Sequence, residues 1–352
     1  MTSSQKVNEA FIEQHGYCAR LGSPFMARAC TLFAENLSPD LPHTRFLYEW
    51  PGDLSPMGIN IPLRLFGALH YLVLSGQDKN LATVYPPHDV NVSDETLWVA
   101  FNTALKIHES FIASYMQHPP QTNEVGRSAI LLPGFCEIAK QTGGLPFVMS
   151  EIGASAGLNL NWDLFHYTFA GQDWGRDTAS VRLSPDWQGH RPALCNIDVV
   201  QKSACDQNPV PLGAGRDAMR LLSYTWPDQL QRLQRTRAAI NIAEQQKTRV
   251  DKADAYDWLK TRLDTLSPNK VHVIYHTIVW QYFPDALKAK TQALIEAAGT
   301  KARKDAPLAW LAFEADGKSP GAALSLTLWP GGEKQILARA DYHGRWIDWQ
   351  KF

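Results

Sequence analysis

The chain has 352 residues, of which 45% are hydrophobic and 20% charged, so it is long enough for two globular domains with sizeable cores. Its formal net charge is -1, from 34 basic and 35 acidic residues, and this balance predicts that it does not bind nucleic acid. The first residues lack a signal-peptide pattern and no apolar run could span a bilayer, so we expect a cytoplasmic protein without membrane contact.

Helical periodicity dominates residues 1–142, which we expect to form an all-helical N-terminal domain. His70 and His108 fall on apolar helix faces and are expected to be core histidines. The chain has five cysteines, none in a C-x-x-C pair, so no metal site is predicted. Four helices are expected, near residues 7–15, 24–36, 63–73 and 98–111.

From Gly143 onward short apolar runs alternate with helical stretches, which is typical of a mostly parallel α/β sheet. Pro330, Gly331 and Gly332 separate two further runs, at 323–328 and 336–340, and predict a C-terminal antiparallel hairpin. We therefore predict a Rossmann-like domain over residues 143–352. Residues 167–192 alternate aromatic and polar residues, so we expect an inserted β-ribbon outside that sheet. The expected parallel strands are 147–152, 199–205, 248–250, 271–275 and 308–313.

The most informative segment is E-I-G-A-S-A-G, from Glu151 to Gly157, between the first expected strand and a helix that starts near Leu158. Its glycines permit positive φ and a close approach of ligand to backbone, and free amides at the helix start can bind a polar group. A carboxylate at the strand end is a poor neighbour for a pyrophosphate but suits a cationic amino group. The segment therefore favours S-adenosylmethionine over NAD as cofactor.

Residues 143–345 resemble class I methyltransferases in this motif, in the acids after the second and third expected strands, and in the terminal hairpin. In that family the first motif holds the methionine moiety, the second acid the ribose hydroxyls and the third acid the adenine. The resemblance implies a methyltransferase-type Rossmann domain that binds S-adenosylmethionine. The implied cofactor residues are Glu151, Gly153, Ser155 and Gly157 in the first motif, Asp206 for ribose and Asp254 for adenine. Asn159, two residues after the motif, is a further cofactor-binding candidate.

The whole chain is also similar to a bacterial family of unknown function that joins a helical N-terminal half to such a domain. The matching stretches are T-N-E-V-G-R-S-A, E-I-G-A-S-A-G-L-N-L, C-D-Q-N-P, A-D-A and A-D-Y-H-G-R-W-I-D-W. This second resemblance supports the fold and implies no reaction. Two features depart from the methyltransferase pattern. About fifty residues separate the first motif from Asp206, and no N-P-P-Y or D-P-P-Y follows the fourth strand, which argues against methylation of a base or glutamine amino group.

Further candidates lie at the strand ends and near the C-terminus. His276 ends the fourth expected strand and is either a general base for the methyl acceptor or a structural histidine. Arg127, expected on one helix with Asn123 and Glu124, either pairs with the cofactor carboxylate or is solvated beside a helix capped by Asn123. We predict that three residues line a substrate pocket, although the C-terminal aromatic cluster could instead anchor the last strand: Trp280, Tyr282 and His343.

The predicted function is methyl transfer to an unknown small-molecule or protein acceptor. A non-catalytic sensor or scaffold that keeps the cofactor fold is one alternative. A serine hydrolase is another, because G-A-S-A-G fits the nucleophile elbow G-x-S-x-G and Ser155, Asp316 and His343 follow in the appropriate order. Against the hydrolase, Glu151 places a carboxylate near the expected oxyanion, and no H-G-G-G-like segment precedes the motif.

Overall fold

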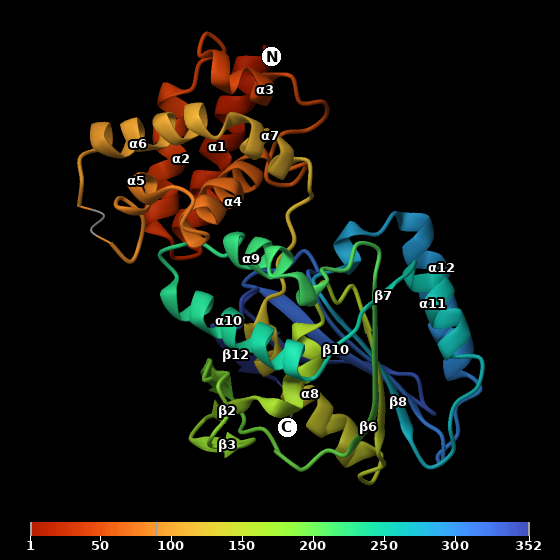
Figure 1. Cartoon of the computed structure of the whole chain (residues 1–352). Coiled ribbons are helices and arrows are strands. Elements are labelled where there is room, and N and C mark those ends of the chain that lie inside the picture. Colours follow the sequence, from red (N-terminus) through yellow and green to blue (C-terminus); the bar gives the residue numbers. More distant parts are fainter. Residues whose placement is uncertain (1, 89–90, 351–352) are drawn as a thin grey trace. The chain divides into compact units, whose positions relative to one another are not determined.

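The computed structural model of the chain describes residues 2–88 and 91–350, which form two compact units (Figure 1). The first unit comprises Met1–Thr122 and Gly213–Arg237, and the second comprises Asn123–Leu212 and Ala238–Phe352. The first unit thus includes a segment from the middle of the chain. The helix that precedes the first strand, α8 (Ser128–Gln141), belongs to the second unit.

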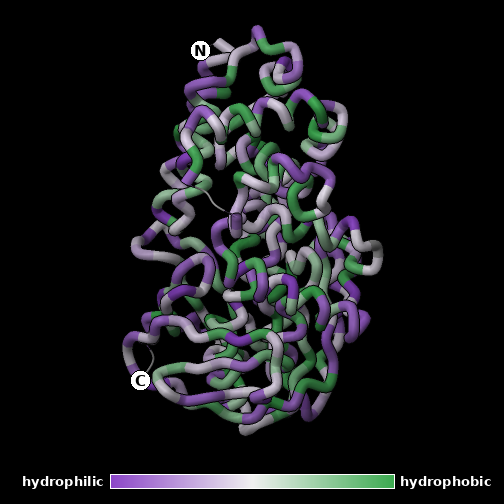
Figure 2. The backbone as a smooth tube through the Cα atoms, turned by 60° about the vertical axis from the view of Figure 1, so that its left-hand side comes forward, coloured by the Kyte–Doolittle hydropathy of each residue, from purple (hydrophilic) through white to green (hydrophobic). Residues whose placement is uncertain are grey.

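The first unit is helical, as its sequence pattern predicts, and Figure 2 shows hydrophobic and hydrophilic residues interleaved along its helices. Its core contains a cluster of phenylalanines, among them Phe33, whose ring lies 5.3 Å from that of Phe11 and 5.0 Å from that of Phe66. The fourth expected helix is interrupted at His108, whose side chain bonds to Asp78. The helices are α1 (Ser3–Arg20), α2 (Pro24–Asn36), α3 (Arg45–Tyr48), α4 (Ile61–Leu74), α5 (Lys79–Ala82), α6 (Asp94–Ile107), α7 (Glu109–Met116) and α9 (Arg216–Ser223), while α10 (Leu230–Gln245) continues into the second unit.

The second unit is built on a nine-stranded sheet of order β5-β12-β11-β10-β9-β8-β1-β6-β7. The five strands from β9 to β7 are parallel, whereas β10, β11 and β12 are joined by antiparallel pairing, and β5 pairs in parallel with β12. A mostly parallel α/β sheet with an antiparallel hairpin is therefore confirmed. The strands are β1 (Phe147–Ile152), β5 (Asp186–Gly189), β6 (Val199–Asp206), β7 (Asp251–Lys252), β8 (Val271–Thr277), β9 (Leu308–Glu314), β10 (Ala322–Trp329), β11 (Lys334–Ala340) and β12 (Trp346–Trp349).

Two strand predictions were wrong. The third parallel strand is Asp251–Lys252 rather than 248–250, because this two-residue exposed strand has no apolar pattern to mark it. The inserted segment is not wholly outside the large sheet. Its first three strands form a separate small sheet, but β5 pairs with β12 at the edge of the large one. The small sheet consists of β2 (His166–Phe169), β3 (Gln172–Trp174) and β4 (Arg182–Leu183).

The large sheet is covered on both faces. Helix α8 packs on β9 and β10, whereas α11 (Ala255–Arg262) and α12 (Asp285–Gly299) pack on the opposite face (Figure 1). Because side chains alternate along β1, Ile152 enters the core beneath α11 and α12, and Glu151 points to the α8 side. The Phe135 ring of α8 lies 5.3 Å from that of Tyr275, on the same side of the sheet as Glu151.

Candidate functional site

The order of the parallel strands reverses between β1 and β8. Strands β6 and β7 extend the sheet on one side of β1, and β8 and β9 extend it on the other. Open α/β sheets bind ligands outside the carboxyl ends of their strands at such a reversal. The switch-point site is defined here as the turn 151–159, the end of β8 with residues 277–279, and Arg127.

A buried carboxyl group stands at the end of β1. Glu151 is 3% exposed, and its Oε2 accepts a hydrogen bond of 3.1 Å from the hydroxyl group of Tyr275 on β8. Burial raises the pKa of Glu151 to about 8; the Tyr275 bond acts in the opposite direction and the charge of Asp206 adds to the increase. Glu151 therefore carries a proton at neutral pH. It becomes a carboxylate when the pH is higher, or when a cation beside it stabilises the negative charge.

Ser155 is the most unusual residue of the turn. Its φ is +55°, a left-handed conformation that is uncommon outside glycine, while Gly153 and Gly157 have φ of +66° and +71°. Ser155 is only 6% exposed, and among the described residues its Oγ has no hydrogen-bonding partner. An unpaired buried hydroxyl costs about 1–3 kcal/mol, and strained backbone is concentrated at functional sites. The unpaired hydroxyl and the strained backbone therefore both mark Ser155 as a candidate ligand-binding residue.

The amides of the turn are largely satisfied within the protein. The N–H groups of Gly153 and Ala154 donate to the carbonyl oxygen of Cys205, at 2.9 and 3.1 Å. The amide of Ser155 donates to Asp206 Oδ2 at 2.8 Å, and that of Leu158 donates to Asn123 Oδ1 at the same distance. These donors hold the turn against the end of β6 and the segment before α8, instead of standing free as the sequence suggested.

Neighbouring side chains leave no room for a Cβ atom at Gly153 or Gly157. A Cβ atom at Gly153 would lie 2.2 Å from Cγ2 of Val279, and one at Gly157 would lie 2.9 Å from methyl groups of Thr248 and Val250. Val279 thus occupies the space that the missing side chain of Gly153 leaves. Packing against Val279 therefore explains why position 153 is glycine, and no ligand is needed to explain it.

The two acids after the second and third parallel strands also bind backbone. Asp206 ends β6, as expected, and its Oδ1 accepts a bond of 2.8 Å from the amide of Asn208. Asp254 caps the N-terminus of α11, where its Oδ1 accepts bonds from the amides of Tyr256 and Asp257 at 2.9 and 3.4 Å. Their contacts with ribose and adenine stay predictions.

The segment before α8 has a different local structure from the one predicted. A short 3-10 helix, η2 (Val125–Arg127), precedes α8, so Asn123 and Glu124 lie outside any helix. Glu124 rather than Asn123 provides the cap, by accepting a bond of 2.9 Å from the amide of Gly126. The single helix expected through Asn123 and Arg127 was therefore wrong.

Arg127 and Asn159 connect separate segments of the site. The Arg127 guanidinium donates to the carbonyl oxygens of Tyr342 and Thr277, at 3.0 and 3.1 Å, and so links the end of β8 to the C-terminal segment. Asn159 donates to the carbonyl oxygen of Glu124 at 3.1 Å and accepts from the hydroxyl of Ser128 at 2.8 Å. Both side chains position backbone around the turn.

Both ring nitrogens of His276 have partners. The indole N–H of Trp310 donates to Nε2 at 2.9 Å, so Nε2 is an acceptor and Nδ1 carries the proton. Nδ1 then donates to Glu314 Oε1 at 2.6 Å, and the Trp280 ring stacks on the imidazole at 5.0 Å. This arrangement favours the structural interpretation of His276 over a general base.

Glu314 also fixes the loop after β8, since its Oε1 accepts a second bond of 3.0 Å from the amide of Val279. Ile278, immediately before, has a φ of +52°, which is a pronounced outlier for a β-branched residue. Sequence reasoning missed Tyr275, Ile278, Val279 and Glu314. Only their position next to a strand end could have indicated them.

The three residues predicted to line a substrate pocket have different surroundings. Tyr282 is 74% exposed in η5 (Trp280–Tyr282), beyond the end of β8. Trp280 packs between His276 and Phe283, whose ring lies 5.2 Å away. The backbone of His343 lies against Gly126, where a Cβ atom would be 2.2 Å from the His343 carbonyl oxygen. Of the three, Tyr282 is the most accessible to an acceptor.

The geometry gives Ser155 no catalytic base. Activation of a serine requires a base within hydrogen-bonding reach, and among the described residues Ser155 Oγ has no partner. Asp316, the expected third member of a triad, instead binds the Arg339 guanidinium through two bonds of 2.8 and 3.2 Å. These contacts argue against the hydrolase alternative.

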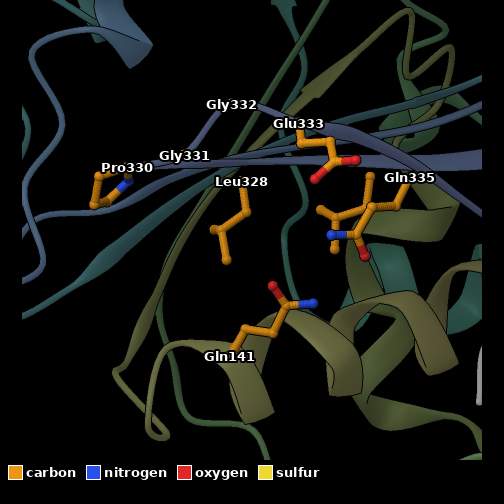
Figure 3. Close-up of a pocket in the computed structure, with 8 residues that line it drawn as sticks. Gln141, Leu328, Pro330, Gly331, Gly332, Glu333 and Gln335 are labelled. Atoms are coloured by element: carbon orange, nitrogen blue, oxygen red, sulfur yellow. The ribbon is translucent and has the colours of Figure 1, made fainter.

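A pocket of about 170 Å³ lies elsewhere, beneath the hairpin between β10 and β11 (Figure 3). Leu328 on its wall pairs with the first part of β9, so the pocket is at the amino ends of the parallel strands. The switch-point site is at their carboxyl ends, and the two are therefore distinct. The pocket is lined by Gln141, Leu326, Leu328, Pro330, Gly331, Gly332, Glu333 and Gln335.

The described residues contain neither a metal-binding cluster nor a helix suited to crossing a membrane. Among them, no group of three or more His, Cys, Asp or Glu side chains is arranged to hold a metal ion. In the same part of the chain, no helix combines the length and apolar content needed to cross a membrane.

Comparison with known proteins identifies the family. Residues 8–349 match the family described as uncharacterized protein conserved in bacteria, DUF2332. The chain belongs to this family. No curated protein and no solved structure is similar enough to match. The match includes both T-N-E-V-G-R-S-A and A-D-Y-H-G-R-W-I-D-W, which the structure brings together at Gly126 and His343.

Proposed function

We propose that the second unit binds S-adenosylmethionine at the switch-point site and methylates a small-molecule or protein acceptor. The observation that supports this most directly lies at the end of β1, the middle one of the five parallel strands. A buried carboxyl group, Glu151, stands there in the same turn as Ser155, which has a strained backbone and a hydroxyl group without a hydrogen-bonding partner. Numbered along the chain, the five parallel strands have the spatial order 3-2-1-4-5, which begins the order of nucleotide-binding doubly wound sheets.

The residues of the site fit an amino-acid-bearing nucleoside. When bound, S-adenosylmethionine supplies a methyl group on a cationic sulfur. Glu151 would hold the amino group, because a buried carboxyl group ionises readily beside a cation. Ser155 Oγ would gain the hydrogen bond that it lacks. Each Asp206 oxygen accepts one backbone N–H and keeps a lone pair for a ribose hydroxyl.

Catalysis would depend mainly on how the protein positions the methyl donor and the acceptor. His276 has both nitrogens engaged, so its contribution would be to orient the loop that carries Trp280 and Tyr282. Tyr282, exposed at the end of that loop, would contact the acceptor. Holding reactants at near-attack distance supplies a large part of the rate enhancement in bimolecular reactions.

A non-catalytic scaffold is the second candidate, and one observation favours it. Val279 fills the space beside Gly153, and the amides of the turn are satisfied within the protein. A protein that kept the fold without the cofactor would have this arrangement. In a methyltransferase, the loop containing Val279 would move when ligand binds.

Isothermal titration of S-adenosylmethionine and S-adenosylhomocysteine into the whole chain tests the proposal. We expect micromolar binding of both, weakened at least about tenfold by Glu151→Gln, which corresponds to about 1.4 kcal/mol. Glu137→Gln is the matched control, because Glu137 is also a buried glutamate but lies on α8. Absence of binding at millimolar ligand would reject the methyltransferase proposal and leave the scaffold.

The same titration detects ionisation of Glu151. Near neutral pH the pKa of about 8 keeps this group protonated, so binding of an ammonium group to it releases a proton. The observed enthalpy should therefore vary with the ionisation enthalpy of the buffer. This dependence should disappear in Glu151→Gln and persist in Glu137→Gln.

A further inference from the structure

A pair of cysteines in the second unit has no role in the switch-point site. Cys136 lies on α8, and Cys195 lies in the connection between β5 and β6. Each thiol is within hydrogen-bonding distance of the other residue's carbonyl oxygen, at 3.8 and 3.9 Å. The two residues, 59 positions apart in the chain, therefore lie side by side, with each thiol directed at the backbone of the other.

The two cysteines differ in exposure. Cys136 is 1% exposed, whereas Cys195 is partly exposed. The indole N–H of Trp174 donates to the carbonyl oxygen of Cys195 at 2.8 Å and fixes the backbone of the more exposed cysteine. A reagent from solvent would meet Cys195 first, and only Cys195 would deliver it to Cys136.

We propose that Cys136 and Cys195 form a site of reversible oxidation, at which Cys195 exchanges with a low-molecular-weight disulfide and Cys136 then closes an intramolecular disulfide. In the first step the Cys195 thiolate attacks one sulfur of the small disulfide, and one small thiol leaves. In the second step Cys136 loses its proton and attacks the Cys195 sulfur, and the second small thiol leaves. Two protein thiols are oxidised, and one small disulfide is reduced to two thiols.

The closing step should be slow at neutral pH. Burial, together with the neighbouring Cys195 thiol, raises the pKa of Cys136 to about 12, and only the thiolate attacks. The closing rate should therefore increase with pH. The covalent ring would contain β1 and the turn 151–157, so oxidation would restrain the segment that carries Glu151 and Ser155.

A second cysteine pair provides an internal control. Cys18 on α1 and Cys30 on α2 are also neighbours whose thiols shift each other's pKa, but neither residue is exposed. Burial raises the pKa of Cys30 strongly. Proximity of thiols is common to both pairs, and access from solvent distinguishes Cys136 and Cys195.

The test uses the full chain, incubated folded with oxidised glutathione, then denatured, alkylated and mapped by mass spectrometry. We expect a Cys136–Cys195 cross-link and alkylation of Cys18, Cys30 and Cys205. Cys136→Ser should stop the reaction at a stable glutathione adduct on Cys195, and Cys195→Ser should leave Cys136 reduced. The proposal is overturned if Cys195 keeps glutathione in the wild-type chain without cross-linking, or if Cys18 and Cys30 oxidise equally fast. The wild-type mapping decides the matter even where a variant fails to fold.

Discussion

The buried carboxyl group of Glu151 predicts a specific pH dependence of stability. Its pKa is about 8 in the folded chain, raised from an ordinary value of 4.5. A raised folded-state pKa means that the unfolded state releases the proton first. The contribution of Glu151 is therefore fully present below about pH 4.5 and is lost as the pH rises toward about 8.

The size of the effect follows from linkage. Each pKa unit corresponds to about 1.4 kcal/mol, so the wild-type chain should lose roughly 3–4 kcal/mol between about pH 5 and about pH 8 through this group alone. Glu151→Gln removes the titration while its amide oxygen can still accept the bond from Tyr275. The variant should therefore lack this part of the pH dependence.

Denaturant unfolding of both chains at the two pH values measures the difference. The comparison of wild type with Glu151→Gln at each pH cancels every other titrating group. We expect Glu151→Gln to be relatively more stable at the higher pH by the amount above. Parallel pH profiles would refute the reasoning and show that the Glu151 carboxyl group is ionised and solvated in the folded chain.

Three further predictions concern the turn and its neighbours, and thermal or denaturant unfolding checks each of them. Gly153→Ala should cost about 2–4 kcal/mol, because the new Cβ meets Val279 at positive φ, and Val279→Ala in the same chain should recover part of that loss; simple additivity would contradict the contact. Ser155→Gly should stabilise the chain by about 1–2 kcal/mol, since it removes an unpaired hydroxyl and backbone strain; a loss would show that Oγ has a partner. Asp254→Ala should cost about 1 kcal/mol and Asp254→Asn much less, because the side chain caps α11 at Tyr256; equal losses would contradict the capping role.

The fold was predictable where burial produces a pattern. Four of the five parallel strands and both strands of the hairpin were found from their apolar residues. The signal is strongest in β1 and β8, because strands buried between helices are hydrophobic along their length. The pattern fails where a strand is short or exposed. Strands β7 and β5 are of this kind, and their pairing is determined by neighbours rather than by their own residues.

The site was predictable only in part. Glycines and the strand-ending Glu151 mark a turn at a sheet edge, and the turn is there. Sequence cannot show what fills the space beside a glycine, so the contact between Gly153 and Val279 was missed. It also cannot show that Arg127 binds the carbonyl oxygens of Thr277 and Tyr342, since these partners are far away in the chain.

The energetics of the turn give the strongest reason to expect a ligand there. Ser155 and Ile278 both adopt positive φ at adjacent strand ends, and each conformation costs about 1–3 kcal/mol. A turn that only joined β1 to the following 3-10 helix would be more stable with glycine at position 155, which would also remove the unpaired hydroxyl. Internal packing accounts for Gly153, Asp206 and Asp254, but it gives no role to the Ser155 hydroxyl group. A bound amino-acid-bearing ligand would explain that hydroxyl group, which lies in the same turn as a carboxyl group that a cation would ionise.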